Sequence, residues 1–345
     1  MKGIVIALDW IDGREVAVLL RDGRLDDLLV ELPDAPPAPG AIFRAIADRP
    51  LKGQGAMLMR LPDGKSAFLR DSVGLKPGQA ALVQVTSYVE AEKAVPVTAK
   101  VLFKSRYVIV TPEAPGLNVS RRVKDDERRV ELLDLAEAGM AGSGMGLILR
   151  SEAETGDDAA IAEDIALTRE LAEKVVADAD GDAPELLLDG PGPHLAGWRD
   201  WPAPDMLDEE PGSFARHGVA DLLDGLRSDS VPLGGGAHAW IEPTRALVAV
   251  DVNTGADGSL AAGLKANLAL ARDLPRQLRL RGLGGQITLD LAPMPKKDRP
   301  AFEGHLRAAF KTDPVDTALA GWTPLGHYEL QRKRERLQIP RDLIP

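Results

Sequence analysis

The chain has 345 residues, 44% of them hydrophobic and 28% charged, which suffices for two or three globular domains with substantial cores. Its formal net charge of −11 argues against a protein that coats nucleic acid indiscriminately. It contains no cysteine, which excludes disulfides, Cys-ligated zinc and a thiol nucleophile.

The first residues do not have the pattern of a signal peptide or a membrane span. No apolar run approaches the length of about eighteen residues that a membrane-spanning helix needs. Asp9 and Asp12 interrupt the first apolar run before a signal-peptide core could form. We therefore expect a cytoplasmic protein with no membrane partner.

The chain begins with apolar runs at residues 3–9, 15–20 and 25–31. The turn signals Asp-Gly at 12–13 and Asp-Gly-Arg at 22–24 separate them, which predicts a β-meander.

Short alternating segments then follow a Pro-rich connector over residues 33–40. They extend over residues 41–99, with turns at 62–64 and 76–78. This spacing is typical of a small five-stranded barrel.

The middle of the chain reads as mixed α/β. We predict strands at 107–110 and 146–150, a charged helix at 125–138 and a long helix at 157–177.

The most informative stretch is residues 245–294, which read as strand, helix, strand. The apolar run 246–250 stops at Asp251 and is typical of a strand covered on both faces. Helical spacing from Leu264 to Leu280 is followed by Gly282 and by a second strand that ends at Asp290.

Strands joined by a helical crossover are normally parallel, so Asp251 and Asp290 should emerge at the same edge of one sheet. Two converging carboxylates repel, and a hard divalent cation such as Mg²⁺ or Mn²⁺ would relieve that repulsion. Asn253 adds a neutral amide on the same side. Alternatively, both Asp residues simply terminate strands and cap the turns that follow.

Three segments in this stretch resemble the ribonuclease E/G family of endoribonucleases: VDVNTG at 250–255, RQLRLRGLGG at 276–285 and TLDLAPM at 288–294. The resemblance implies that Asp251 and Asp290 bind Mg²⁺ and that Asn253 lies beside them in the site.

The resemblance also implies an α/β protein of several subdomains. Residues 1–38 would begin an RNase H-like subdomain, and residues 186–240 would return to it in a shortened form. Two subdomains would be inserted between these parts: an OB-fold RNA-binding barrel at 39–103 and a 5′-sensor-like subdomain at 104–185. Residues 241–345 would form a DNase I-like catalytic subdomain.

Several side chains then become candidate RNA contacts. Phe68 matches a base-contacting aromatic of the family's barrel, although it could equally be a core residue, and Leu58 occupies the other aromatic position. The basic candidates for RNA phosphates are Arg279, Arg281, Arg332 and Arg334, the last two on a predicted closing helix end that could also be merely solvated.

Arg150 and Ser151 match the Arg-Thr pair with which the family's sensor subdomain binds a 5′-terminal monophosphate. An Arg fork and a neighbouring hydroxyl suit the oxygens of a terminal phosphate. Without the resemblance, Arg150 reads as an exposed arginine at a strand end.

The chain also departs from the family pattern. Pro293 stands where the family has a second Asp, Pro275 is expected to kink or interrupt the crossover helix, and the loop after Gly255 is shorter. The Cys segment that links protomers of longer members through zinc is absent, so no zinc is expected, and any oligomer would not be zinc-linked.

Together these features predict a Mg²⁺-dependent endonuclease of single-stranded RNA, either rRNA or mRNA, that leaves 5′-phosphate and 3′-hydroxyl ends. The alternative is a non-catalytic RNA-binding or ribosome-maturation factor that kept the fold. Retention of Asp251, Asn253 and Asp290 speaks against this alternative, because binding alone does not need them.

Overall fold

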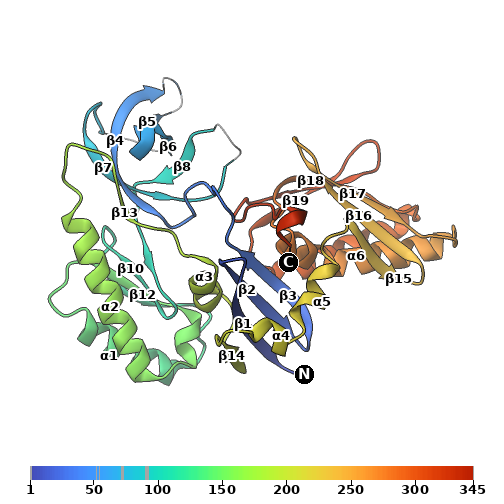
Figure 1. The fold of residues 1–345 in the computed structure, drawn as a ribbon, viewed down its shortest axis with the longest axis horizontal. Helices are drawn as coiled ribbons and strands as arrows, with labels where there is room; N and C mark the ends of the chain where they lie inside the picture. Colours follow the sequence, from blue (N-terminus) through green and yellow to red (C-terminus); the bar gives the residue numbers. More distant parts are fainter. Residues whose placement is uncertain (1, 52, 54, 71–73, 90–92, 345) are drawn as a thin grey trace. The chain divides into compact units, whose positions relative to one another are not determined.

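The computed structural model describes residues 2–51, 53, 55–70, 74–89 and 93–344 (Figure 1). The chain divides into two compact units, one formed by residues 1–32 and 204–345 and the other by residues 33–203.

A closed β-barrel opens the second unit. Its described strands are β4 (Ile42–Leu51), β5 (Ala56–Arg60), β6 (Ser66–Arg70), β7 (Ala80–Val85) and β8 (Val95–Thr98). The order β4-β5-β6-β8-β7 closes because β4 also pairs with β7, so over the described residues the predicted five-stranded barrel is confirmed.

The rest of this unit is a mixed sheet covered by helices. The strands β9 (Phe103–Lys104), β10 (Val108–Thr111), β11 (Leu117–Val119) and β12 (Gly146–Leu149) have the order β11-β12-β10-β9. Two long helices pack on it, α1 (Asp126–Gly139) and α2 (Asp158–Ala177), and buried residues of both share a core with the strands. Asp125 and Asp157 cap the two helix N-termini through their side chains, which explains why the predicted helix starts were accurate.

Two elements assigned from sequence to the return segment belong to this unit instead. The strand β13 (Glu185–Leu188) pairs with β4 of the barrel, and α3 (Pro193–Asp200) follows it. The predicted boundary at residue 186 is therefore wrong, because the backbone hydrogen bonds of β13 are made with the barrel.

The first unit begins with the predicted meander. The strands β1 (Ile4–Ile11), β2 (Arg14–Arg21) and β3 (Arg24–Val30) are antiparallel, and β14 (Met206–Asp208) adds to β1 in parallel. Both residues of the Asp12-Gly13 turn have positive φ, 51° and 76°, the backbone that two-residue hairpins with the right twist require. The short helices α4 (Ser213–Arg216) and α5 (Val219–Asp224) pack on this sheet.

A larger sheet completes the unit. Its order is β15-β16-β17-β18-β20-β19, formed by β15 (Ser230–Gly234), β16 (Ala237–Pro243), β17 (Val248–Asn253), β18 (Gly285–Asp290), β19 (Thr317–Trp322) and β20 (Tyr328–Arg332). Because β15 and β16 are part of it, this sheet starts near residue 230 and not at the predicted residue 241. The turn at Gly234 to Gly236 joins β15 to β16, as predicted for a hairpin.

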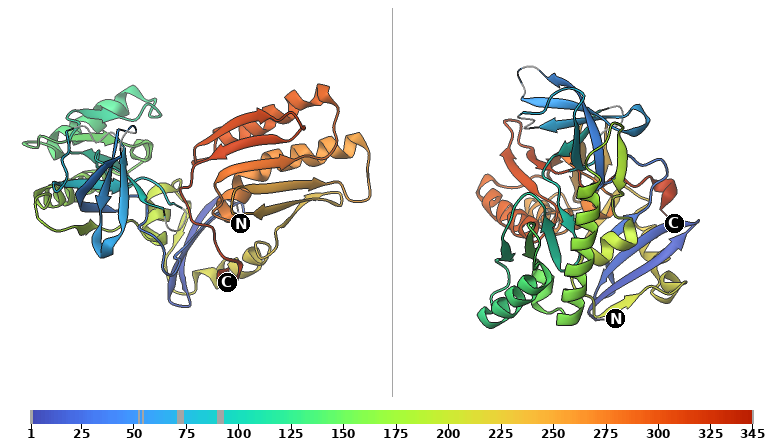
Figure 2. Two further views of the ribbon diagram at one scale, coloured as in Figure 1. Left: turned by 90° about the horizontal axis from the view of Figure 1, so that it is seen from above. Right: turned by 90° about the vertical axis from the view of Figure 1, so that its left-hand side faces the viewer.

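Two helices, α6 (Leu260–Leu280) and α7 (Arg299–Lys311), lie along this sheet in Figure 2. Their apolar residues share one buried core with alternate residues of the strands. The helix α6 continues through the buried Pro275, contrary to the predicted interruption. Residues 333–338 are not helical, so the predicted closing helix is absent from this described part of the chain.

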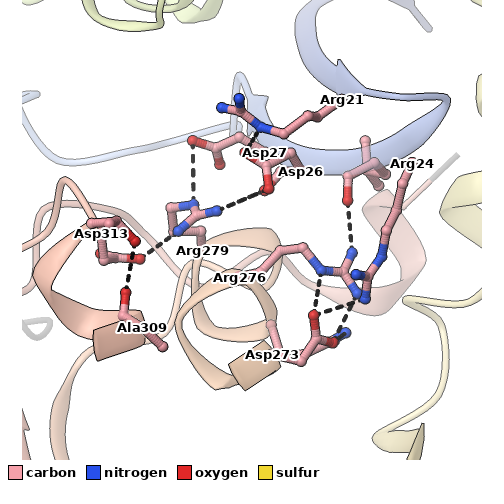
Figure 3. Close-up of polar contacts among 12 residues, drawn as sticks. Arg21, Arg24, Asp26, Asp27, Asp273, Arg276, Arg279, Ala309 and Asp313 are labelled. Carbon is pink, nitrogen blue, oxygen red and sulfur yellow. Dashed lines mark hydrogen bonds and ion pairs between the residues drawn. The ribbon is translucent and has the colours of Figure 1, made fainter. Parts of the chain in front are cut away.

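A cluster of charged side chains, drawn in part in Figure 3, connects β3 with α6. We call it the ion-pair cluster, and its members are Arg24, Asp26, Asp27, Asp273, Arg276, Arg279, Asp313, Arg332 and Arg336. Asp27 and Asp313 are its buried acids, with side chains 2% and 0% exposed. Each acid faces two arginines, so the charges of distant segments compensate one another inside the unit.

Asp208, at the end of β14, is an acid held by neighbouring basic side chains. Its carboxylate accepts hydrogen bonds from Arg216 Nη2 at 2.6 Å and Nε at 3.0 Å, and it lies 2.9 Å from His217 Nε2. Hydrogen bonding from Arg216, aided by His217 and opposed by burial, lowers the pKa of Asp208 from 3.8 to about 2.

A carboxyl whose pKa is lower in the folded state stabilises the fold above its unfolded pKa, and this contribution disappears as the pH falls through the folded pKa. We therefore expect Asp208→Asn to be less stable than wild type at pH 6, with the difference shrinking between about pH 4 and pH 2. Urea unfolding across this range measures it, with Asp224→Asn as an exposed-acid control. A pH-independent difference would contradict the prediction.

Candidate active site

The two aspartates predicted to emerge at one sheet edge lie side by side on neighbouring strands. The strands β17 and β18 are parallel, and their register pairs Asp251 directly with Asp290. Adjacent strands are about 4.8 Å apart, so the two side chains start at that spacing and project from the same face. The predicted parallel pairing with both residues at one edge is confirmed.

The face that carries these carboxylates is open. Along β17, Val248, Val250 and Val252 are buried, whereas Asp251 is exposed. The prediction that this strand is covered on both faces is wrong, because α6 and α7 cover one face only of the described sheet. The short side chain of Ala249 on the open face made the run look uniformly apolar.

Asn253 lies on the open face two residues beyond Asp251. Its Nδ2 donates a 2.7 Å hydrogen bond to Asp251 Oδ2. This bond orients the Asp251 carboxylate and leaves the amide oxygen of Asn253 available as an acceptor.

The chain that follows Asp290 is clamped to α6. Asn267, which is fully buried, donates from Nδ2 to the Ala292 carbonyl at 2.8 Å and accepts from the Ala292 N–H at 3.0 Å. A Cβ on Gly263 would lie 2.2 Å from the Pro293 carbonyl oxygen, so only glycine permits this close approach of helix and loop. Pro293, a departure from the family pattern, thus stands in a loop held by the α6 backbone and Asn267.

The structure adds three aromatic side chains to the site that sequence analysis did not select. His327 Nε2 lies 3.7 Å from Asp290 Oδ1. On β16, Trp240 pairs in register with Asp251 and His238 with Asn253. The alternation of His238, Trp240 and Glu242 with Ala239 and Ile241 is a signal that could have identified the open face of this strand.

A pocket of about 260 Å³ lies between the β15–β16 turn, the loop that follows β17 and the N-terminal part of α6. Its lining includes Thr254 and Lys265 together with Gly234 and Gly235 of the β15–β16 turn. Gly255 brings this turn and the loop after β17 together, since a Cβ there would lie 2.6 Å from the Gly236 carbonyl oxygen.

The donor set fits a hard divalent cation. Asp251, Asp290 and Asn253 provide carboxylate and amide oxygens, and Mg²⁺ is typically held by one or two carboxylates while it keeps several waters. Within the described ranges, no group of three or more His, Cys, Asp or Glu side chains is arranged to hold a metal ion.

Three of the predicted phosphate-contacting arginines lie in the interior. Arg279 faces Asp26, Asp27 and Asp313, and Arg332 Nη2 donates to Asp313 Oδ1 at 3.0 Å. Arg281 bonds to Gln277 and to the Ser228 carbonyl, and burial, together with the charge of Arg276, lowers its pKa to about 10.

The exposed fraction is only 9% for Arg279, 8% for Arg281 and 2% for Arg332. Guanidiniums buried in this way do not contact an RNA phosphate, so the predicted RNA contacts of these three residues are contradicted by the structure. Arg334 is half-buried, and its RNA contact stays a prediction.

Arg150 and Ser151, the residues predicted to bind a 5′-phosphate, also make contacts within the protein. Arg150 Nη1 donates to the carbonyls of Ser105, Arg106 and Arg199, and Nη2 donates to Asp200 Oδ1 at 3.2 Å. The Ser151 hydroxyl is 3.2 Å from both carboxylate oxygens of Glu152. This arrangement contradicts a phosphate-binding fork at Arg150 and Ser151, because the donors are used and the neighbouring carboxylates repel an anion.

Phe68 lies on the outer surface of the barrel. Its neighbours in sequence, Ala67 and Leu69, belong to the barrel core, whereas Phe68 is partly exposed and pairs in register with Leu58. The Arg70 guanidinium lies 6.0 Å from the centre of the Phe68 ring. The alternative that Phe68 is a core residue is therefore wrong.

None of the described helices is both long and apolar enough to cross a membrane.

Comparison with a family model and comparison with individual proteins lead to the same family. A model of the ribonuclease E/G family matches residues 103–208 and 204–335. The chain is 28% identical to a ribonuclease E of Synechocystis sp., over 97% of this chain and 56% of that protein, and 30% identical to a ribonuclease E of Nostoc sp., over 77% and 44%. It is 27% identical to ribonuclease G of Escherichia coli, over 87% of this chain and 73% of that protein. The chain thus spans about half the length of the two ribonuclease E proteins.

Proposed function

The chain belongs to the ribonuclease E/G family, and from this membership we propose that it is an endoribonuclease that hydrolyses phosphodiester bonds of single-stranded RNA. The observation that carries the proposal is the register of β17 and β18, which sets Asp251 beside Asp290 on an open sheet face. A shallow, exposed pair of carboxylates suits a long polymeric substrate, because the RNA strand can lie across the face.

Mg²⁺ is the metal that we propose for this site, with Mn²⁺ as a possible substitute and Asp251 and Asp290 as its ligands. A bound Mg²⁺ supplies positive charge that stabilises the negative charge developing on the phosphodiester. Asn253 orients the Asp251 carboxylate through its 2.7 Å hydrogen bond and presents its amide oxygen to a water or to the RNA. By analogy with the family, the products carry 5′-phosphate and 3′-hydroxyl ends.

The test is cleavage of a short, A/U-rich single-stranded RNA by the wild-type chain, with Mg²⁺ and with EDTA. We expect cleavage only with Mg²⁺, and labelling of the product ends identifies the 5′-phosphate. Tight binding without cleavage in Mg²⁺ or Mn²⁺ would favour the non-catalytic RNA-binding alternative.

We further propose that the outer surface of the barrel binds RNA through Phe68. Aromatic stacking contributes about 1–3 kcal/mol per base to single-strand binding, so Phe68→Ala should weaken binding roughly 5- to 100-fold. Because Leu58 pairs directly with Phe68, Leu58→Phe should strengthen binding several-fold by adding a second ring. Fluorescence anisotropy with labelled RNA in EDTA measures both changes.

Leu186→Phe is the matched control for the expected increase in RNA affinity. Leu186 is exposed on β13, so this substitution adds the same aromatic ring at a position away from Phe68. An equal gain in both Phe variants would attribute the effect to general hydrophobicity and contradict the assignment.

A further inference from the structure

Trp240 occupies a defined place beside the two carboxylates. In the register of the sheet, Ser230, Trp240, Asp251 and Asp290 form one row across β15, β16, β17 and β18. Register partners in a sheet project from the same face, and adjacent strands are about 4.8 Å apart. The indole therefore rises from the open face directly next to Asp251.

The indole is partly exposed although it is a large apolar side chain. Trp240 is 39% exposed, whereas its neighbours on β16, Ala239 and Ile241, are fully buried on the opposite face. The small side chain of Ser230 flanks it on the outer strand. His238 meets it edge-on, with ring centres 6.2 Å apart and planes at 82°. The packing thus supports the ring from one side and leaves a large part of it uncovered.

An exposed aromatic ring next to a phosphodiester-binding site has a specific use in nucleic-acid binding. Every nucleobase has a flat π-face that can stack on such a ring, and stacking is tolerant of sequence. In an RNA strand whose phosphate lies at Asp251 and Asp290, a base of an adjoining nucleotide would meet whatever side chain stands beside Asp251. On this face that side chain is Trp240.

We propose that Trp240 is a stacking platform for a single unpaired nucleobase adjoining the scissile phosphodiester. This inference rests on the proposed function for the position of the phosphodiester, but base binding by Trp240 is measurable without cleavage. A base must be unstacked from its neighbours to lie on the indole, so Trp240 selects single-stranded or locally opened RNA at the cleavage position. His238 is a positioning residue that holds the ring orientation.

The decisive experiment is abasic scanning of a short single-stranded RNA. Each nucleotide in turn is replaced by an abasic one, and binding is measured by anisotropy for wild type, Trp240→Ala and Trp240→Phe, with Ca²⁺ present as a hard cation that can occupy the two carboxylates in place of Mg²⁺. For wild type, one abasic position should weaken binding roughly 5- to 100-fold through the loss of this stack. Trp240→Ala should bind intact RNA more weakly than wild type by the same factor, and an abasic nucleotide at this position should not weaken its binding further. Trp240→Phe should retain most of the wild-type pattern.

Trp10→Ala is the matched control, because Trp10 is 51% exposed on β1 in the same unit. It should reproduce the wild-type scan. Two results would overturn the proposal: a Trp240→Ala variant that binds intact RNA as tightly as wild type does, or one whose loss of affinity at each abasic position equals that of wild type.

The two proposals fail separately in this design. If wild type does not cleave RNA in Mg²⁺ but one abasic position depends on Trp240, base stacking on Trp240 stands, whereas the endonuclease proposal and the placement of that base beside a scissile phosphodiester both fall. If wild type cleaves, and the position that depends on Trp240 does not adjoin the mapped cleavage position, the endonuclease stands and the stacking proposal falls.

Discussion

Replacing Asp290 with asparagine is expected to abolish Mg²⁺-dependent RNA cleavage while leaving the fold intact. The side chain of Asp290 is 69% exposed, so the substitution removes a charge without disturbing the core. A metal ion contributes several kcal/mol of charge stabilisation in the transition state, and each 1.4 kcal/mol corresponds to a factor of ten, so we expect a loss of roughly 10²- to 10⁴-fold in kcat/KM. Asp251→Asn should have an effect of the same order, because the two carboxylates act together.

The matched control is Glu242→Gln. Glu242 is an exposed acid on β16, two residues from Trp240 on the same strand, and its substitution removes the same charge from the sheet. Circular dichroism and thermal unfolding should be unchanged in all three variants. Cleavage at more than a tenth of the wild-type rate by folded Asp290→Asn would reject the assignment of the site.

Replacing Asp313 with asparagine is expected to destabilise the first unit by about 3–5 kcal/mol. The carboxylate is fully buried and accepts from Arg332 Nη2 at 3.0 Å, with Arg279 on its other oxygen. The Arg332 side chain is itself only 1% exposed. Removing the negative charge therefore leaves positive charge inside the unit, which costs far more than the loss of a surface pair. Urea unfolding monitored by tryptophan fluorescence measures the change.

Asp224→Asn supplies the comparison, because the Asp224–Arg227 pair has side chains 71% and 53% exposed and such surface pairs contribute at most about 1 kcal/mol. Adding Arg332→Met to Asp313→Asn should recover part of the lost stability, since the double variant removes the buried Arg332 charge whose acidic partner is Asp313, whereas Arg279 keeps Asp26 and Asp27. If Asp313→Asn lowers the free energy of unfolding no more than Asp224→Asn does, the buried ion-pair cluster stabilises the unit no more than a surface ion pair.

The features near the candidate site that depend on neighbouring residues could be predicted from the sequence. A strand, a helix and a second strand in succession form a parallel pair, which brought Asp251 and Asp290 together without knowledge of any other contact. The hairpin at Asp12-Gly13 and the caps at Asp125 and Asp157 were predictable for the same reason, since local backbone geometry selects these residues.

Features that depend on distant residues were not predictable in this way. Arg279, Arg281 and Arg332 were read as surface charges. In the interior, however, Asp27 on β3 meets Arg279, Asp313 meets both Arg279 and Arg332, and the Ser228 carbonyl accepts a hydrogen bond from Arg281. The donors of Arg150 are likewise used by carbonyls and by Asp200 from other elements. Whether a guanidinium is free to bind phosphate depends on which acids and carbonyls the fold brings to it.

The sequence by itself therefore determined the family, the barrel and the placement of two carboxylates at one sheet edge, because strand, turn and helix signals act over a few residues. Only the tertiary structure decided which face of the sheet is open and which aromatic rings stand beside the carboxylates. Trp240 faces Asp251 because of the register between β16 and β17, and a shift of one residue would have turned it to the buried face. Register and helix coverage are properties of the whole unit, since they are selected by the packing of α6 and α7 on the opposite face.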